Sequence, residues 1–154
     1  MVLRTRARGC LTMAGDYVPS PRGWVRRQVE QIEATGTTES VDILGRPVVL
    51  VTMRGAKSGA IRKVPLMRVV RDGVYAAVGS QGGSPDHPQW VHNLRAHPEV
   101  DLQDGRDTFR VRARELTPDE RDEWWPVCVA AFPPYAEYQE KTDRVIPVFV
   151  LERV

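Results

Sequence analysis

The chain has 154 residues, enough for one domain with a buried core, and its 42% hydrophobic and 27% charged residues are ordinary for a soluble globular protein. Its 22 basic and 20 acidic residues nearly balance, so general basicity does not indicate a nucleic-acid-binding protein. No apolar run approaches the roughly 18 residues that span a bilayer, and the basic N-terminus lacks the apolar centre of a secretory signal, so we expect a cytoplasmic protein with no transmembrane segment.

Residues 1–18 show no hydrophobic period and carry several arginines. We predict a flexible tail there, followed by a single domain over residues 19–154. A helix is predicted from Pro21, because apolar residues recur at helical spacing up to Gly36, a common stop signal.

Three strands are predicted next. Residues 46–53 form an apolar run rich in β-branched side chains, which is typical of a buried strand. Residues 62–71 indicate a second strand, in which Pro65 favours an edge or bulge position because proline cannot donate to a neighbouring strand. The Asp-Gly pair at 72–73 is a strong hairpin signal and leads to a third strand at 74–78.

The second half of the chain mixes helices and strands. A glycine-rich loop precedes a short helix over about 88–96, for which Asp86 is the expected N-terminal cap. The remaining predicted elements are strands at 100–103 and 108–115, a helix that starts from a capping box at Thr117, a short segment with two tyrosines, and a strand at 146–152. Six strands that suit antiparallel pairing predict an α+β fold, mainly β, built as a small barrel or rolled sheet with helices packed outside.

The run RGAKSGAIRK at residues 54–63 holds four basic residues and no acidic one. It belongs to a stretch between positions 42 and 72 that contains no carboxylate, so the segregation of charge is local. The glycines allow a tight turn, while Lys57, Ser58 and Arg62 offer a point charge, a hydroxyl and a forked guanidinium, which suit a phosphate or a carboxylate. A solvated basic hairpin tip accounts for the same run, and the spacing is not that of a nucleotide-binding P-loop.

Two further segments are candidate ligand sites. The small residues GSQGG at 79–83 follow a strand and allow a flat ligand to approach the backbone, although the same residues also suit a simple turn. Tyr135 and Tyr138 are three residues apart, so on a helix they share one face and present two phenols, with Phe132 nearby. Tyrosines at the rim of the core are the alternative interpretation.

The histidines and cysteines do not predict a metal site. His87, His92 and His97 are five residues apart, a spacing that does not share a helix face, and prolines interrupt the segment. Cys10 and Cys128 have no motif spacing and fit free thiols of a reducing compartment. The common hydrolase and metalloprotease motifs are also missing from the sequence.

Taken in order, three motifs resemble the deazaflavin-dependent nitroreductase family of actinobacteria: VTMRGAKSGAIRKVPLM, VGSQGGSPDHPQWVHNL and FPPYAEYQEKTDRVIPVFVLE. The similarity extends from about Pro21 to the C-terminus. It implies a split β-barrel related to flavin-mononucleotide-binding oxidases, and it implies binding of the 8-hydroxy-5-deazaflavin coenzyme F420. Flavin mononucleotide on the same barrel is the alternative cofactor.

The resemblance also implies a set of site residues. It places the cofactor's phosphate and acidic tail against Ala56, Lys57, Ser58, Arg62, Lys63, Val64, Pro65 and Leu66. It places the deazaflavin ring against Val78, Gly79, Ser80, Gln81 and Gly82, with the groove completed by Gln89, Trp90 and Asn93. It implies that Tyr135 and Tyr138 face the ring and the substrate, and these two tyrosines and Ser80 are the candidate catalytic residues.

Such a cofactor suits the acid-free stretch, because a phosphodiester, a lactyl carboxylate and an oligoglutamate tail carry several negative charges along one ligand. Two positions depart from the family pattern. Ala56 stands where some members have arginine, and Gln81 stands where many have lysine. Each departure removes one cation from the expected site, and Lys63 is the residue that can compensate.

The resemblance implies an oxidoreductase that transfers a hydride from reduced F420 to a quinone, a nitroaromatic or an activated alkene. A non-catalytic carrier of F420, flavin or another planar ligand on the same fold is the alternative, and the loss of the lysine at Gln81 keeps it open. The expected partner is a small-molecule hydride acceptor, not a nucleic acid, and the chain is expected to be a monomer or a homodimer.

Overall fold

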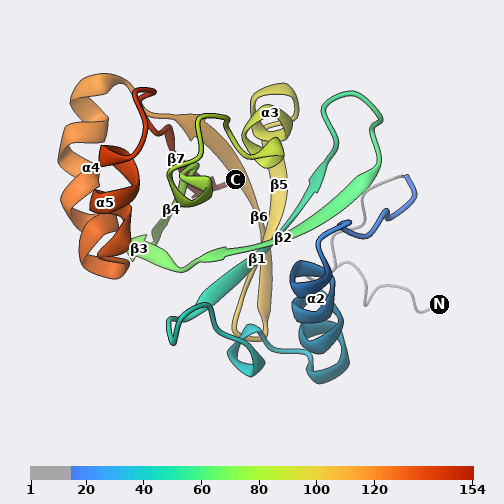
Figure 1. The fold of residues 1–154 in the computed structure, drawn as a ribbon. Coiled ribbons are helices and arrows are strands. Elements are labelled where there is room, and N and C mark those ends of the chain that lie inside the picture. The colour runs from blue at the N-terminus through green and yellow to red at the C-terminus, as the bar shows by residue number, and fades with distance from the viewer. Residues whose placement is uncertain (1–14) are drawn as a thin grey trace.

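A computed structural model describes residues 15–154, and Figure 1 shows how the chain folds. The predicted flexible tail over residues 1–18 therefore lies mostly outside the described residues. The residues that follow position 14 run beside the second strand of the sheet. Tyr17 forms an isolated bridge with Ile61, and the Val18 N–H donates to the Ile61 carbonyl at 3.0 Å.

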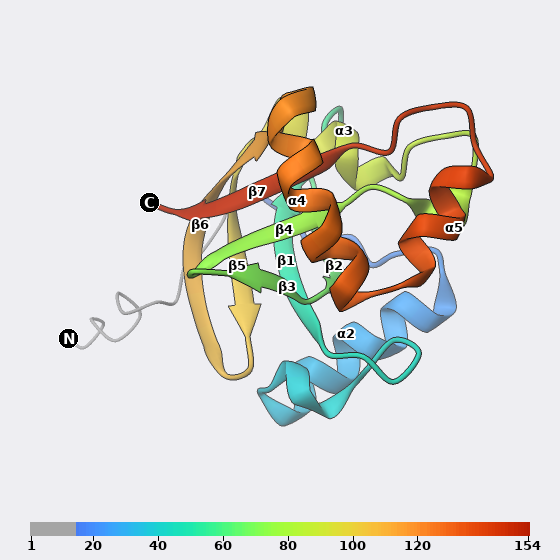
Figure 2. The ribbon, with the colours of Figure 1, turned by 90° about the vertical axis from the view of Figure 1, so that its left-hand side faces the viewer.

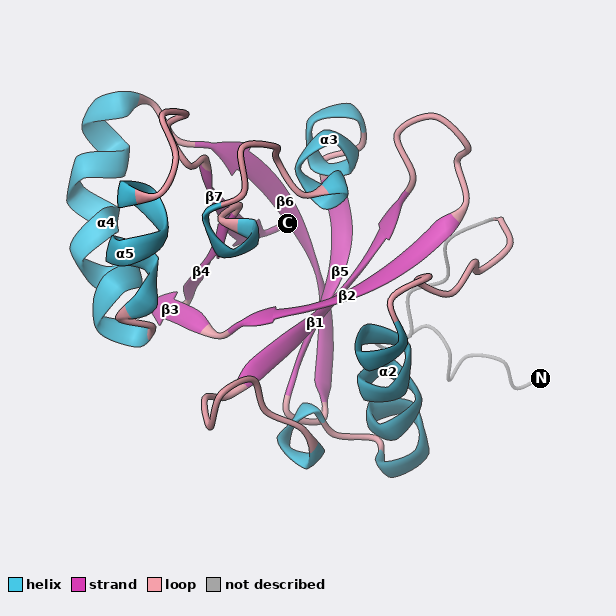
Figure 3. Cartoon of the chain, viewed as in Figure 1, coloured by secondary structure: helices cyan, strands magenta, loops and turns pink. Residues whose placement is uncertain are grey.

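One sheet of seven strands forms the centre of the described chain (Figure 3). The strands are β1 (Val48–Arg54), β2 (Ile61–Met67), β3 (Val69–Arg71), β4 (Val74–Val78), β5 (Glu99–Asp104), β6 (Asp107–Glu115) and β7 (Val148–Arg153). They are ordered β2-β1-β5-β6-β7-β4-β3, and every neighbouring pair is antiparallel.

The two ends of this strand order show that the sheet is rolled. β2 and β3 are its opposite edges, yet only Arg68 separates them in the sequence. Edges that are joined by a single residue must approach each other, so the sheet curls into a split barrel. The Arg68 side chain ties this junction to the end of β5, because its Nε donates to both carboxylate oxygens of Asp104 at 2.9 and 3.0 Å. The predicted α+β split β-barrel is confirmed.

The strand predictions hold with one change. The strand expected over 62–71 is divided at Arg68 into β2 and β3, so the described sheet has seven strands where about six were expected. Pro65 lies on the edge strand β2, as predicted. The β3–β4 turn has positive φ at Asp72 (53°) and Gly73 (78°), as tight hairpin turns between twisted strands require.

Helices cover the barrel from several sides. In residues 15–154 they are α2 (Gly23–Thr35), α3 (Gln89–Ala96), α4 (Pro118–Ala131) and α5 (Pro134–Glu140), with short 3-10 turns η1 (Thr38–Ser40) and η2 (Gln81–Gly83). None of the helices in this part of the chain combines the length and the apolar character needed to cross a membrane.

Helix ends follow the predicted signals in two cases out of three. α2 stops at Gly36, which has a φ of 81°, and α4 starts from a capping box at Thr117. The predicted cap at Asp86 is wrong: Pro88 occupies the cap position of α3, and no side chain caps this helix. Asp86 belongs to the preceding loop, where its N–H donates to Ser84 Oγ at 3.2 Å.

Alternation along the strands divides the core into layers. Val49, Val51 and Met53 of β1 point into the barrel, whereas Leu50 packs outward against the buried face of α2. On the other side, α4 lies over β4 and β7 with α5 beside their ends (Figure 2), and both helices share an apolar cluster with these strands that includes Cys128. The tyrosine-bearing helix α5 is therefore fixed against the sheet close to the loop that follows β4.

Candidate functional site

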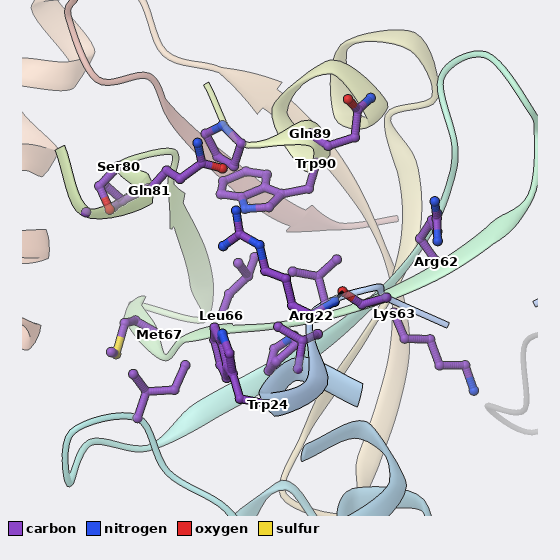
Figure 4. A pocket seen from close by; sticks show the side chains of 18 of the residues that line it. Arg22, Trp24, Arg62, Lys63, Leu66, Met67, Ser80, Gln81, Gln89 and Trp90 are labelled. Atoms are coloured by element: carbon purple, nitrogen blue, oxygen red, sulfur yellow. Dashed lines mark hydrogen bonds between the residues drawn. The ribbon is translucent and has the colours of Figure 1, made fainter. Parts of the chain in front are cut away.

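A cavity of about 680 Å³ opens beside β2, between the start of α2, the loop after β4, and helices α3 and α5 (Figure 4). This volume lies within the range of pockets that hold drug-sized ligands and cofactors, roughly 300–1,000 Å³. Segments that are far apart in the sequence form its wall, because the rolled sheet brings them together.

Most of the residues predicted from the sequence line this cavity. They are Arg62, Lys63, Val64, Pro65, Leu66, Val78, Ser80, Gln81, Gly82, Gln89, Trp90, Asn93, Tyr135 and Tyr138. Four predicted residues do not line it: Ala56, Lys57, Ser58 and Gly79. The fold therefore brings the three motifs to one place, with the turn after β1 at its border.

That turn is linked to the cavity through α3. The Ala56 N–H donates to Asn93 Oδ1 at 2.9 Å, and Asn93 is part of the cavity wall. The Ser58 hydroxyl oxygen accepts the Ala60 N–H at 3.1 Å, so it stabilises its own turn. Lys57 has no hydrogen bond or ion pair among residues 15–154, which leaves its ammonium group available to a ligand.

Two cations of the wall also hold the chain that precedes α2. Arg62 Nη1 donates to the carbonyls of Val18 and Pro19 at 2.9 and 3.2 Å. Lys63 forms an ion pair with Glu33 of α2 and lies 5.0 Å from the ring centre of Tyr17. Arg62 keeps further N–H groups for a ligand, whereas the charge of Lys63 is already compensated. The expected contribution of Lys63 to an anion site is thus smaller than its position in the sequence indicates.

The loop after β4 adopts a conformation that gathers backbone donors. Ser80 is in the right-handed helical region (φ −78°, ψ −39°), and Gln81, Gly82 and Gly83 follow with φ of 43°, 63° and 83°. Successive N–H groups around such a right-to-left-handed step form a concave nest that binds anions or carbonyl oxygens. The N–H groups of Ser80, Gln81 and Gly82 have no acceptor within residues 15–154.

Gly79 begins this loop and packs closely against Val91 and Pro147. A Cβ at this position would lie 2.7 Å from Val91 Cγ2 and 3.0 Å from Pro147 Cγ, closer than packed side chains allow. Glycine is therefore required for close packing against α3 and the start of β7, and it contributes no surface to the cavity.

The tyrosines of α5 line the cavity beside the loop after β4. Tyr135 is only 5% exposed, and its ring lies edge-on to Phe132 at 4.9 Å between centroids. The Tyr138 ring is 6.4 Å from that of Tyr135. Neither hydroxyl has a hydrogen-bond partner among the described residues, and burial strongly raises the pKa of the Tyr135 phenol. The two phenols are therefore suited to interact with a ligand.

The sequence did not single out the wall on the N-terminal side of α2. The additional lining residues are Val18, Ser20, Pro21, Arg22, Trp24, Val25, Ile43, Leu44, Met67 and Pro88, and Phe132, which the sequence grouped with the two tyrosines, lines the cavity as well. Figure 4 shows the Arg22 side chain directed into the cavity on the side of Trp90. The period of α2 predicts its buried face, but no local signal indicates that its first turn closes a cavity with β2.

Comparison with known proteins identifies the family. The family model described as F420H(2)-dependent quinone reductase matches residues 24–153. The chain belongs to this family. An F420H(2)-dependent quinone reductase of Mycobacterium tuberculosis strain H37Rv is 39% identical over 111 residues, which cover 70% of this chain and 74% of that protein. Membership makes the chain an oxidoreductase whose cofactor is F420, as the resemblance implied.

Solved structures agree with this assignment. A chain described as a domain-swapped dimer is 55% identical, with a TM-score of 0.68, and covers 86% of this chain and 100% of its own. The F420-H2 dependent reductase FDR-A is 56% identical, with a TM-score of 0.66, and covers 73% of this chain and 99% of its own. The heme storage protein HutZ from Vibrio cholerae is 14% identical, with a TM-score of 0.53, and shares the fold alone; it covers 71% of this chain and 83% of its own.

The cavity residues fit the chemistry of F420. The unpaired N–H groups of the loop after β4 suit the carbonyl oxygens of a flat deazaflavin, and Trp90 offers an apolar wall to its ring. Arg62 on the cavity wall and Lys57 in the turn at its border are cations that suit a phosphate or a carboxylate tail. The donors, the aromatic wall and the cations thus match the three parts of the cofactor.

Proposed function

We propose that this protein transfers a hydride from reduced F420 to a quinone that is held in the cavity beside β2. The observation that carries the proposal is the convergence of two sets of free donors on one cavity. Backbone N–H groups at Ser80–Gly82 lie on one wall, and the phenols of Tyr135 and Tyr138 lie on another.

The chain's own residues have three tasks. When bound, reduced F420 supplies a hydride from carbon 5 of its ring. Lys57 and Arg62 bind the phosphate and the acidic tail, while the loop at Ser80–Gly82 orients the flat ring. The apolar side chains of Trp24 and Phe132 exclude water from the space between ring and acceptor.

Tyr135 is placed to act on the acceptor. A quinone that gains a hydride develops negative charge on one oxygen and becomes a hydroquinone after it takes up one proton. Burial raises the pKa of Tyr135, so its phenol stays neutral and can donate a hydrogen bond from Oη to the oxygen that gains negative charge, while the proton that completes the hydroquinone comes from solvent. Ser80, which is 7% exposed, offers a second hydroxyl donor from the neighbouring loop after β4. A nitro group or an activated alkene requires the same donors, so these acceptors belong to the proposal as secondary substrates.

A fluorescence titration of the purified protein with oxidised F420, with flavin mononucleotide in parallel, tests the cofactor. Saturable F420 binding in the micromolar range with little flavin binding is the expected result. Turnover of menadione with reduced F420 then separates an enzyme from a carrier, because a carrier quenches fluorescence without oxidising the cofactor. A yellow protein that prefers flavin mononucleotide would overturn the cofactor assignment.

We also propose that the chain forms a homodimer, because a 55% identical chain is described as a domain-swapped dimer. Light scattering during size-exclusion chromatography measures the mass of the protein in solution, and the mass of a single chain would contradict a homodimer. The expected cytoplasmic location remains a prediction, which fractionation of expressing cells would test.

A further inference from the structure

Arg144 lies in the segment between α5 and β7 and does not line the cavity. Its side chain bonds to the loop after β4 on the side of that loop that faces away from the cavity. Its Nε donates to the Ser84 carbonyl at 2.9 Å, Nη1 to the Gly79 carbonyl at 3.1 Å, and Nη2 to the Ser80 carbonyl at 2.9 Å. Nη1 also lies 2.8 Å from Nδ1 of His87. One guanidinium therefore holds three carbonyls of a single loop.

Arg144 is itself held firmly. Gln139 of α5 donates from Nε2 to the Arg144 carbonyl at 2.8 Å, and its Oε1 accepts the Ile146 N–H at 2.9 Å. Arg121 of α4 donates to the Ile146 carbonyl at 2.8 Å and to Gln139 Oε1 at 2.9 Å. The segment that carries Arg144 is thus anchored to both helices, and Arg144 extends this anchor to the loop.

The direction of the carbonyls decides where the loop's donors point. In a trans peptide the C=O and the following N–H point in opposite directions. Because the carbonyls of Gly79 and Ser80 are directed at Arg144, the N–H groups of Ser80 and Gln81 point away from it. Ser80 and Gln81 both line the cavity, and neither N–H has an acceptor within residues 15–154.

The conformation needs such support. Gln81 has a φ of 43°, a left-handed backbone conformation that disfavours a residue with a side chain. Within the loop, the Gly83 N–H bonds to the Ser80 carbonyl at 2.9 Å and the Ser84 N–H to the Gln81 carbonyl at 3.1 Å, while Gln81 Nε2 adds longer bonds to Ser84 Oγ at 3.3 Å and to the Asp86 carbonyl at 3.4 Å. The three bonds from Arg144 come in addition, on the face away from the cavity.

The chemistry of the contact requires arginine. Arg144 forms no ion pair with any carboxylate among the described residues, so its role is to donate to carbonyls. Three donors in a fixed plane can reach three oxygens at once, whereas the ammonium of lysine is a single point on a flexible stem.

We infer that Arg144 is a positioning residue, which orients the N–H nest at Ser80–Gly82 for the carbonyl oxygens of the deazaflavin ring. This inference rests on the proposed function of that loop. It also links the loop to α5, so that the N–H nest and the two tyrosines keep a fixed relation to each other.

The test uses the full chain with Arg144→Lys and Arg144→Gln, with Arg110→Lys as the control. Arg110 is half-buried and bonded to Asp101, but it does not contact the loop. Amide exchange measured by NMR in the cofactor-free protein reports on the Gly83 and Ser84 N–H groups. Both Arg144 variants are expected to lose about tenfold or more of the protection of these amides and about 10- to 100-fold of F420 affinity or of kcat, as is typical when a group that orients binding residues is removed. Arg110→Lys is expected to keep the amide protection of Gly83 and Ser84, and also the F420 affinity and kcat of the unmodified protein, even if its thermal stability falls.

Two outcomes would overturn the inference. The first is unchanged protection of Gly83 and Ser84 in Arg144→Lys, and the second is unchanged affinity and kcat with protection lost. The exchange measurement does not depend on F420. If the unmodified protein fails to bind F420, the proposed function fails, while the amide data still decide whether Arg144 fixes the loop.

Discussion

Two glycine-containing loops are candidate ligand sites in the sequence, and they differ in which of their donors the fold leaves unbonded. In the turn after β1, the Ser58 hydroxyl and the Arg54 guanidinium are bonded within the turn itself, the latter to the Gly59 carbonyl at 3.0 Å. In the loop after β4, three backbone N–H groups have no acceptor among residues 15–154, and Arg144 holds the loop from behind. The first loop also keeps the N–H groups of Lys57 and Ser58 without an acceptor in the described part of the chain, but it lies at the border of the cavity, whereas the donors of the second loop lie on the cavity wall. Composition alone does not reveal which donors a loop keeps for a ligand.

The largest effect is expected at the end of the cavity where the loop after β4 faces the phenols. Tyr135→Phe should lower kcat with a quinone about 100-fold, because removing one hydrogen-bond donor to a developing oxyanion typically costs 10²–10³-fold. Affinity for F420 should change little, since the ring remains. Tyr17→Phe is the matched control, because Tyr17 is 37% exposed and does not line the cavity. Full activity of Tyr135→Phe would assign the stabilisation of the oxyanion to another group.

A glycine pair, one from each loop, compares the rigidity of the two loops. Gly83 has a φ of 83°, and a Cβ there would lie 2.8 Å from the Tyr138 carbonyl oxygen and 3.0 Å from Lys141 Cβ. Gly59 has a φ of 71°, but a Cβ there would have no atom within 4 Å. Gly83→Ala should reduce the free energy of unfolding by roughly 2–4 kcal/mol, from backbone strain plus overpacking against α5. Gly59→Ala should cost only about 1 kcal/mol, from strain alone.

Urea denaturation of both variants provides the measurement. Equal losses would mean that the loop after β4 is not packed more tightly than the turn after β1. A loss confined to Gly83→Ala would support the contrast, and its menadione turnover should fall as well, because α5 carries both tyrosines.

A smaller effect is expected in the turn after β1. Lys57→Ala should weaken F420 binding about fivefold and leave kcat unchanged, because an exposed charge contributes up to about 1 kcal/mol. Raising the salt concentration should weaken F420 binding to the unmodified protein and reduce the difference in F420 affinity between it and Lys57→Ala. Lys141→Ala is the control, since this lysine lies 5.7 Å from the ring centre of Tyr138 and does not line the cavity. A fall in kcat without a change in affinity would contradict an anchoring role.

The sequence predicted those parts of the fold that depend on local signals. The stop at Gly36, the turn at 72–73 and the capping box at Thr117 each act within a few residues, and all three are confirmed. The cap at Asp86 failed because the start of α3 is determined by how Trp90 and other wall residues pack, and this packing is tertiary.

The residues of the site were also predicted only in part. Motif resemblance located the loop after β4 and the tyrosines, but the wall contributed by Arg22 and Leu44 exists only once the sheet has rolled. The partners of Arg144 are 60 to 65 residues earlier in the sequence, so no periodicity or spacing could indicate them. The charges of Arg62 and Lys63 were visible in the sequence, but their protein partners were not.

The smallest expected effect is a dependence of stability on pH, and it should differ between the loop after β4 and the turn after β1. The pKa of His87 is lowered from 6.5, first by burial and then by the neighbouring charges of Arg144, Arg95 and His92, with Glu115 acting in the opposite direction. Above about pH 6.5 the ring is neutral, and Nδ1 can accept from Arg144. As the pH falls below 6.5 and through the lowered pKa, the folded protein must take up a proton that the unfolded chain binds more readily, so this contribution to stability is lost.

His87→Asn keeps an acceptor for Arg144 without a titrating group. The unmodified protein should therefore lose stability between pH 7 and pH 5 relative to His87→Asn, and protection of the Gly83 and Ser84 amides should fall with it. The turn after β1 contains no group that titrates in this range, so the amide exchange of Gly59 and Ala60 should not follow the same curve. Parallel pH curves for both loops would show that acid loosens the whole domain, and the separate anchoring of the loop after β4 by Arg144 and His87 would then be wrong.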